Sequence, residues 1–303
     1  MSFIKKFILS VLLIFPLIAL ADTDTTDTDI TTLLQSTQTT ALPERIASFS
    51  AVFLNKPYLL EPLGEGPTGE FNQKPLYRLD GFDCQTFVET VIALALSNNV
   101  DEFKQNINKI RYQDGNINFA NRNHFPSADW LPNNIQNGVL EDITRNIGGS
   151  NIATATANIN RKNWYAHLTE DRINLPNLTD DEEANKFEQL KALGAKAKNT
   201  IAKIDYIPLN SIIRDGNVNI LLLNRIPNGA VILLVAHYPR IEKNIGTQLN
   251  VSHMGFAIWK NDKLYFRAAS TWYQKVVDIK LTDYLKKFTG QPYVKGINIV
   301  EVK

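Results

Sequence analysis

The chain has 303 residues, of which 44% are hydrophobic and 21% charged, and its formal net charge is +1. This is ordinary globular composition, enough for one large domain or two modest ones. The nearly neutral balance gives no sign of the basic patch or stripe that nucleic-acid binding usually requires, and it favours a small or uncharged substrate over a polyanion.

The N-terminal 21 residues have the parts of a secretory signal peptide. Lys5 and Lys6 precede an apolar run over 7–20, and Ala19 and Ala21 stand where a signal peptidase recognises small residues. An uncleaved anchor is the alternative, but the run is short for a membrane span of about 20 residues. We therefore expect cleavage after about Ala21 and a mature protein that is periplasmic or secreted and free of the membrane.

Residues 22–40 are rich in Asp and Thr and contain little apolar material. Such a segment buries too little apolar surface to hold a fixed structure, so we expect a disordered linker here. Residues 41–303 are then expected to form a single domain with helical insertions.

Apolar residues at helical spacing predict several helices in the first half of the mature chain. The clearest begins at Cys84 and continues to Ser97; Asp83 is a good N-cap residue, and Glu89 can stay outside the broad apolar face. The segment 111–134 carries aromatic residues among polar ones and predicts a structured loop region. Further helices are expected over 42–53, 101–110 and 179–197.

From Tyr206 onward the pattern changes to apolar runs with β-branched residues, which predict strands. Asn261 and Asp262 supply a two-residue hairpin turn. The predicted fold class is α+β, a helical N-terminal lobe followed by an antiparallel sheet. The expected strands cover 218–223, 230–237, 252–260, 263–268, 275–279 and 296–302.

Cys84 is the single cysteine of the chain. Exported proteins commonly use cysteines in disulfide pairs, so a lone thiol is a liability unless it is buried or used. A buried free cysteine packs as a small hydrophobe, which is the alternative to a reactive one. Because Cys84 lies on the first turn of a helix, the free N–H groups and dipole there favour the thiolate.

A reactive thiol also needs a base, and four histidines are available: His124, His167, His237 and His253. His253 begins a predicted strand, which fixes a side chain more firmly than a loop does, and Gly255 permits close approach of another backbone. His253 is the candidate base. The alternative is a surface histidine at the end of a strand.

Several segments together resemble the papain-like cysteine hydrolases of the NlpC type, which cut peptidoglycan, and within them the exported N-acetylmuramoyl-L-alanine amidase-like family. The resemblance runs from about Phe53 to Val302. It is carried, in order, by Phe53-Leu54-Asn55-Lys56-Pro57-Tyr58, Phe82-Asp83-Cys84-Gln85-Thr86-Phe87-Val88-Glu89, Ile110-Arg111-Tyr112-Gln113-Asp114-Gly115, Asn121-Arg122-Asn123-His124-Phe125, Asp129-Trp130-Leu131 and Ser252-His253-Met254-Gly255.

The resemblance implies roles for particular residues. Cys84 would be the nucleophile, His253 the general base, and the backbone N–H of Cys84 a donor to the oxyanion. The residues implied to bind substrate are Tyr58, Asp83, His124 and Trp130. For Tyr58 the alternative is a packing aromatic, and for His124 and Trp130 a loop held by a buried histidine and tryptophan. No H-E-x-x-H motif is present, so neither a zinc site nor another cofactor is expected.

The sequence departs from the family pattern at Ala268. Relatives commonly carry a third polar residue, often histidine, on the strand after the histidine strand, whereas this chain has Arg267-Ala268-Ala269-Ser270. Three outcomes stay open: His237, Ser270 or a backbone carbonyl orients His253; the enzyme works slowly with two residues; or catalysis is lost.

The function expected from the resemblance is hydrolysis of the amide between N-acetylmuramic acid and L-alanine, through a thioester on Cys84. The substrates would be peptidoglycan fragments or muropeptides. The alternatives are an endopeptidase that cuts within the stem peptide, a muropeptide-binding protein without catalysis, and an effector aimed at competing bacteria or a host. The sequence leaves the oligomeric state open.

Overall fold

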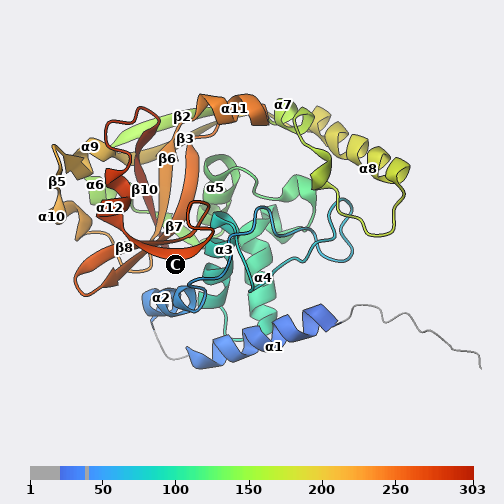
Figure 1. Ribbon diagram of the computed structural model, residues 1–303, viewed down its shortest axis with the longest axis horizontal. Helices are drawn as coiled ribbons and strands as arrows, with labels where there is room; N and C mark the ends of the chain where they lie inside the picture. The colour runs from blue at the N-terminus through green and yellow to red at the C-terminus, as the bar shows by residue number, and fades with distance from the viewer. Residues whose placement is uncertain (1–20, 38–40) are drawn as a thin grey trace, which may run out of the picture.

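A computed structural model describes residues 21–37 and 41–303. The predicted signal peptide, apart from Ala21, lies outside the described residues. In the described part of the chain, one large antiparallel sheet carries helices on both of its faces, as Figure 1 shows. The α+β class expected from the sequence is confirmed.

The large sheet runs in the order β2-β3-β10-β6-β7-β8-β9, and β1 pairs with part of β10. Every pairing in it is antiparallel. A separate two-stranded ribbon is formed by β4 and β5. The strands are β1 (Leu140–Asp142), β2 (Ala153–Ile159), β3 (Thr200–Pro208), β4 (Ile213–Arg214), β5 (Asn217–Val218), β6 (Val231–Ala236), β7 (Val251–Lys260), β8 (Lys263–Ser270), β9 (Lys275–Lys280) and β10 (Val294–Val302).

The α-helices are α1 (Ala21–Ser36), α2 (Leu42–Val52), α3 (Cys84–Ala95), α4 (Val100–Arg111), α5 (Leu131–Gln136), α6 (Thr144–Gly148), α7 (Arg161–Ala166), α8 (Asp180–Ala192), α9 (Leu209–Ile212), α10 (Ile220–Leu223), α11 (Pro239–Ile245) and α12 (Leu281–Lys286). Short 3-10 or π turns occupy η1 (Gln113–Gly115), η2 (Phe119–Asn121), η3 (Pro126–Trp130), η4 (Glu170–Arg172) and η5 (Leu193–Lys196). None of the helices in the described ranges combines the length and apolar character needed to cross a bilayer.

Helix α3 forms because its residues are apolar almost all round, and it is buried against the face of the sheet made by β7 and β8. Phe87 on α3 meets Phe256 on β7 with ring centroids 5.7 Å apart, and both rings are fully buried. Burial of each such side chain contributes about 1.5–3 kcal/mol. This packing fixes the N-terminal end of α3, where Cys84 lies, against the sheet.

Helix α1 occupies most of the segment where the sequence predicts a disordered linker, 22–40, and that prediction is wrong for residues 22–36. Ile30 and Leu34, one turn apart, are fully buried in the core shared with α3 and α4. The Asp27 carboxylate pairs with the Lys104 ammonium at 2.5 Å and accepts a hydrogen bond from Tyr77 at 3.0 Å. A few apolar residues at helical spacing therefore order this polar segment.

The strand predicted over 218–223 is also wrong, because its second half is helix α10. Asn219 caps this turn by accepting a hydrogen bond from the Leu222 N–H at 3.1 Å. A short apolar run cannot by itself distinguish a strand from a buried helical turn. The strands β2 and β3 were not predicted. Strand β2 alternates buried and exposed positions, but its buried positions are mostly small alanines, which give a weak hydrophobic pattern.

Glu89 does not stay outside α3 as expected; its side chain is 1% exposed and pairs with Arg111 of α4, also 1% exposed, at 2.7 Å. The Arg111 guanidinium also donates to the Leu76 carbonyl, and its Nη2 has no partner among the described residues. Gln85 completes the arrangement by donating to Glu89 at 2.9 Å. This buried pair ties the second turn of α3 to the C-terminal end of α4.

Replacing Glu89 with alanine is expected to lower the free energy of unfolding by about 3–5 kcal/mol, because it leaves the buried guanidinium uncompensated. Urea denaturation of the purified protein measures this change. Glu188→Ala is the matched control, since Glu188 forms an exposed pair with Lys191 on α8, and such pairs contribute about 0–1 kcal/mol. Equal effects of the two substitutions would contradict the buried-pair interpretation.

Candidate functional site

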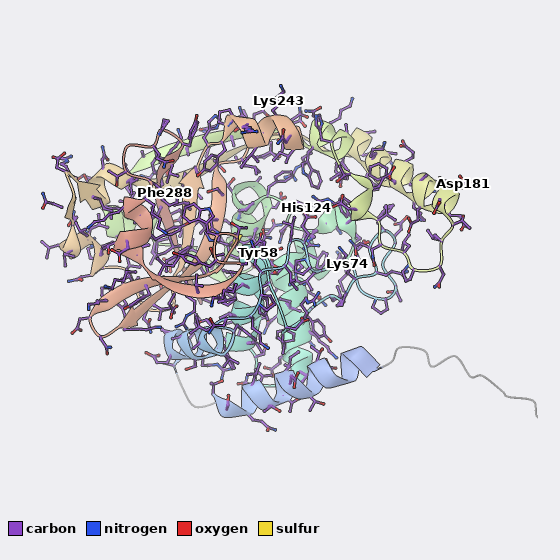
Figure 2. All side chains as sticks on the ribbon, viewed as in Figure 1. Tyr58, Lys74, His124, Asp181, Lys243 and Phe288 are labelled. Carbon is purple, nitrogen blue, oxygen red and sulfur yellow. The ribbon has the colours of Figure 1, made fainter. Side chains whose placement is uncertain are left out.

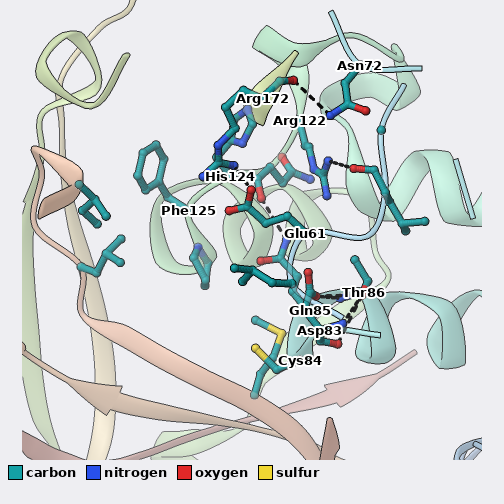
Figure 3. A pocket seen from close by; sticks show the side chains of 18 of the residues that line it. Glu61, Asn72, Asp83, Cys84, Gln85, Thr86, Arg122, His124, Phe125 and Arg172 are labelled. Atoms are coloured by element: carbon teal, nitrogen blue, oxygen red, sulfur yellow. Dashed lines mark hydrogen bonds and ion pairs between the residues drawn. The ribbon is translucent and has the colours of Figure 1, made fainter. Parts of the chain in front are cut away.

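A cleft of about 420 Å³ opens where the N-terminus of α3 meets the start of β7. Cys84 and His253, which lie far apart in the sequence, both line it, together with Tyr58, Asp83 and His124. Figure 3 shows Cys84 at one end of the cleft, Arg122, Arg172 and His124 toward the other end, and Glu61 between them. The structure thus brings together five of the six site residues predicted from the sequence.

Cys84 is the first residue of α3, and a capping box holds it there. The Asp83 carboxylate accepts from the Thr86 N–H at 2.7 Å, and the Thr86 hydroxyl accepts from the Asp83 N–H at 3.0 Å. Gly81 precedes the cap at a point where a Cβ would lie 2.5 Å from the Leu59 side chain and 3.0 Å from the Pro57 carbonyl. A larger residue at that position would push the cap away from the neighbouring segment.

The Cys84 thiol is half-buried, and the groups around it shift its pKa in opposite directions. Burial, followed by the nearby Asp83 carboxylate, raises the pKa of the thiol to about 12, against backbone N–H groups of Met254, Gln85 and Cys84 that lower it. The N–H groups at the helix end that the sequence indicates are therefore present, but desolvation outweighs them. The thiol is protonated at neutral pH in this arrangement.

His253 owes its direction to a bulge at the beginning of β7. Leu234 of β6 pairs with His253, but the next residue of β6, Val235, pairs with Val251, so Ser252 is an extra residue in β7. Bulges re-aim side chains in this way and are common beside active sites. His253 consequently lines the cleft, although the neighbouring Met254 is buried in the core under α3.

The His253 ring is held by packing. It lies 5.5 Å from the Phe266 ring and 6.3 Å from the Tyr284 ring, centroid to centroid. Burial lowers the pKa of the imidazole to about 4, so the ring is neutral at neutral pH and can accept a proton.

The position expected for a third polar residue is occupied by the apolar side chain of Ala268. A Cβ placed on Gly255, two residues after His253, would lie 2.7 Å from the Ala268 Cβ, so Ala268 lies directly beside the histidine strand. The His237 imidazole pairs with Glu242 at 2.9 Å, and the Ser270 hydroxyl accepts from the Tyr273 N–H at 3.4 Å. Within the described ranges, neither side chain is hydrogen-bonded to His253.

Tyr58 is held beside Cys84 by backbone pairing with the segment that precedes α3. Tyr58 forms a parallel bridge with Phe82, and the Phe82 N–H donates to the Pro57 carbonyl at 3.1 Å. Burial, followed by the charges of Cys84 and Asp83, raises the pKa of the Tyr58 hydroxyl. The hydroxyl therefore remains protonated and can donate a hydrogen bond into the cleft. Asp83 is bound to its capping role, and burial raises the pKa of its carboxyl.

His124 forms part of an aromatic wall. Its ring lies 4.7 Å from the rings of Phe119 and Trp164, and its Nε2 donates to the Phe119 carbonyl at 2.7 Å. Burial, followed by the charge of Arg122, lowers the pKa of His124 to about 3. The bond to Phe119 puts the proton on Nε2, so Nδ1 is left as the acceptor.

Trp130 does not line the cleft, and its predicted role in substrate binding is wrong. Its side chain is 0% exposed and packs in the core with Leu131 and residues of α3 and α4, and its indole nitrogen has no described partner. Aromatic residues in a polar segment can face either way, and here the π turn η3 directs this one inward.

Other cleft residues were missed. Arg122 lies two residues before His124, donates to the Leu63 carbonyl at 3.0 Å and lines the cleft. The Arg172 guanidinium pairs with Glu61 at 2.6 Å across the far end. The polar residues around Arg122 could have indicated that it lines a cleft. The Arg172–Glu61 pair could not be predicted, because only the tertiary fold brings its two segments together. Among residues 21–37 and 41–303, no group of three His, Cys, Asp or Glu could hold a metal ion.

Both the sequence and the structure are similar to known proteins. The model of the AmiA-like, N-acetylmuramoyl-L-alanine amidase-like family matches residues 48–291. The structure is similar to that of a Legionella pneumophila protein of the DUF1460 family, with 40% identity over 92% of this chain and 95% of the other, and a TM-score of 0.89. An N-acetylmuramoyl-L-alanine amidase from Bacteroides uniformis shows 25% identity over 85% of this chain and 98% of the other, with a TM-score of 0.62. No curated protein matches the sequence significantly.

Proposed function

The chain belongs to the N-acetylmuramoyl-L-alanine amidase-like family, and from that membership and the cleft at Cys84 we propose that it hydrolyses the amide bond between N-acetylmuramic acid and L-alanine in peptidoglycan fragments. The observation that carries the proposal is the meeting of Cys84 and His253 in one cleft. A helix that begins at the nucleophile and packs on an antiparallel sheet bearing the base supports a papain-like arrangement of the NlpC type.

In the proposed mechanism Cys84 attacks the carbonyl carbon of the lactyl amide while His253 accepts the thiol proton. Because both groups are neutral at rest, the proton moves during attack and not before it. In this proposal the backbone N–H of Cys84 and the Tyr58 hydroxyl donate to the oxyanion. His253 then gives the proton to the departing amine of L-alanine, and the thioester remains.

In deacylation Cys84 is the leaving group, and water takes its place as the nucleophile. His253 removes a proton from water, the resulting hydroxide attacks the thioester, and the Cys84 thiolate leaves and recovers a proton from His253. The products are the free carboxylate on the muramic acid and the free amine on the peptide. We also propose that the mature protein works outside the cytoplasm, on the strength of the signal-like residues 1–21.

Digestion of a purified disaccharide-tetrapeptide muropeptide, with mass analysis of the products, tests the proposal. An amidase releases the intact stem peptide with L-alanine at its N-terminus and leaves the disaccharide with a free carboxyl group. A stem endopeptidase leaves amino acids on the sugar, so the two reactions differ in both product masses. Products that keep L-alanine on the sugar would overturn the amidase proposal in favour of the endopeptidase.

The second candidate is a muropeptide-binding protein without catalysis. It is favoured by Ala268 at the position of a third polar residue and by the packing of the His253 ring against the rings of Phe266 and Tyr284. Retention of the muropeptide in equilibrium dialysis, with no product by mass analysis, would support it over the hydrolase.

The pH dependence follows from the two shifted groups. Below its pKa of about 4 the His253 ring is protonated and cannot act as a base, so kcat/KM is expected to fall as the pH drops through about 4 and to stay level up to neutrality. The Cys84 pKa of about 12 predicts that alkylation by iodoacetamide in the free protein rises about tenfold per pH unit through the neutral range.

The groups that face this pair are Asp83 from the cap, Tyr58 from its loop and Tyr284 from α12. Nuclear magnetic resonance titration of the His253 imidazole separates its pKa from that of the Asp83 carboxyl. A plateau of alkylation between about pH 5 and 8 would instead indicate a thiolate–imidazolium pair and would contradict the neutral-pair mechanism.

A further inference from the structure

Two aromatic residues are exposed in the turn that joins β8 to β9. Trp272 is 61% exposed and Tyr273 is 45% exposed. The turn is held firmly: the Tyr273 N–H donates to the Ser270 hydroxyl at 3.4 Å, and the Lys287 ammonium lies 5.0 Å from the centre of the Trp272 ring. The Phe288 ring supports Trp272 with centroids 6.0 Å apart. An exposed aromatic surface on a supported turn is typical of a ligand-binding position.

This turn lies next to the segment of Tyr58, which lines the cleft. The Tyr58 N–H donates to the Gln274 carbonyl at 3.0 Å, and Pro57 forms an antiparallel bridge with Lys275. Tyr58 itself lines the cleft with Cys84. The turn therefore lies against the segment that forms one rim of the site.

The neighbour of the aromatic turn, Phe288, and the cleft residue His124 are seen on different sides of Tyr58 (Figure 2). In Figure 2, Phe288, whose ring supports Trp272, lies on one side of Tyr58, and His124 and Lys74 lie on the other. The cleft lining includes the charged residues Arg122, Arg172, Glu61 and Lys74, and Figure 3 shows Arg122 and Arg172 at the end of His124.

The two sides differ in chemistry in the way that the two halves of a muropeptide differ. A stem peptide carries carboxylates and amines, which the charged side can pair. A sugar ring presents a face of C–H groups, which packs on an aromatic ring, and hydroxyl and N-acetyl groups, which hydrogen-bond at its edges. Gln274 is exposed beside Trp272 and Tyr273, and its side-chain amide donates to the Thr271 carbonyl at 2.5 Å. The partly exposed Lys275 donates to the Asn55 side chain at 2.8 Å. Each of these two nitrogens carries a further N–H that can serve the edges of a sugar.

We propose that Trp272 and Tyr273 form a platform that binds the sugar rings of the substrate, so that the glycan lies over the β8–β9 turn and the peptide enters the charged cleft. This inference rests on the proposed amidase function, because that reaction requires a sugar on one side of the bond and a peptide on the other. The platform takes the place that Trp130 was expected to fill.

A glycan without peptide tests the platform apart from catalysis. Binding of the β-1,4-linked N-acetylglucosamine tetramer to the full protein is measured by calorimetry and by tryptophan fluorescence. We expect Trp272→Ala to weaken this binding about tenfold, as loss of one buried apolar contact predicts, and Trp272→Phe to restore most of it. Leu221→Ala, which removes an 81% exposed apolar side chain on α10, serves as the control and is expected to bind as the wild type does.

The same variants are then assayed on the disaccharide-tetrapeptide, where Trp272→Ala is expected to raise KM about tenfold and to change kcat less. Failure of the tetramer to bind the wild type, or equal binding by the wild type and Trp272→Ala, would overturn the platform. Binding that depends on Trp272 in a protein that releases no product would retain the platform and overturn the amidase proposal, so the two failures are distinguishable.

Discussion

Replacing Cys84 with alanine is expected to lower kcat/KM for a muropeptide amide by at least about 10⁴-fold. Without the sulfur no thioester forms, and the remaining N–H groups and Tyr58 can only polarise the carbonyl. Product release from the disaccharide-tetrapeptide, followed by mass analysis, measures the loss. The fold should survive, because the capping box at the start of α3 is made by Asp83 and Thr86 and not by Cys84.

Two measurements make this prediction specific. Urea denaturation of Cys84→Ala should give a midpoint near that of the wild type, and equilibrium dialysis should show that the variant still binds the muropeptide. Because Cys84 is the single cysteine of the chain, alkylation of the wild type modifies one thiol and should abolish activity in proportion to labelling. Full activity of the fully alkylated protein would remove Cys84 from the mechanism.

Replacing His253 with alanine is expected to lower kcat/KM by about 10²–10⁴-fold, the range that a positioned general base contributes. His237→Ala is the matched control. His237 follows β6, next to the strand of His253, but its imidazole pairs with Glu242 and does not line the cleft. The control should keep its activity.

A further readout separates a chemical role of His253 from a structural one. If the imidazole is the base, the fall of kcat/KM near pH 4 should disappear in His253→Ala, and free imidazole in solution should restore part of the activity. A variant that loses activity without any change in the shape of its pH profile would point to a packing role against Phe266 and Tyr284.

The sequence predicted the parts of the fold that repeat a strong pattern. Helix α3 has a cap residue and apolar positions nearly all round, and the strands after Val231 are β-branched runs joined by a recognisable hairpin turn at Asn261 and Asp262. Helix α1 could not be predicted in this way, because its sequence is mostly polar; among its described side chains, Ile30 and Leu34 are buried in the core and Leu33 packs against it. Their burial depends on α4, which local sequence does not place.

The site was predicted unevenly for the same reason. The position of Cys84 at a helix end is local, whereas its pairing with His253 came from resemblance, since no local pattern joins α3 to β7. The sign of the Cys84 pKa shift was missed: the helix end is visible in the sequence, but the burial that raises the pKa of the thiol depends on the tertiary fold. Trp130 was placed wrongly for a different reason: the sequence around a tryptophan in a polar segment does not show whether its side chain faces the core or a cleft.

The segment 55–58 has one more consequence, for the order in which the site is assembled. On one side it pairs with the edge strand β9, through Asn55 to the Val276 carbonyl at 2.9 Å and Tyr58 to Gln274; on the other it pairs with Phe82, next to the Cys84 cap. Contacts so distant in sequence form late, because a long loop must close first. Helix α3 can therefore form early with its thiol in place and with Tyr58 joined to it through Phe82, but this segment is fixed from both sides only when β9 closes on it.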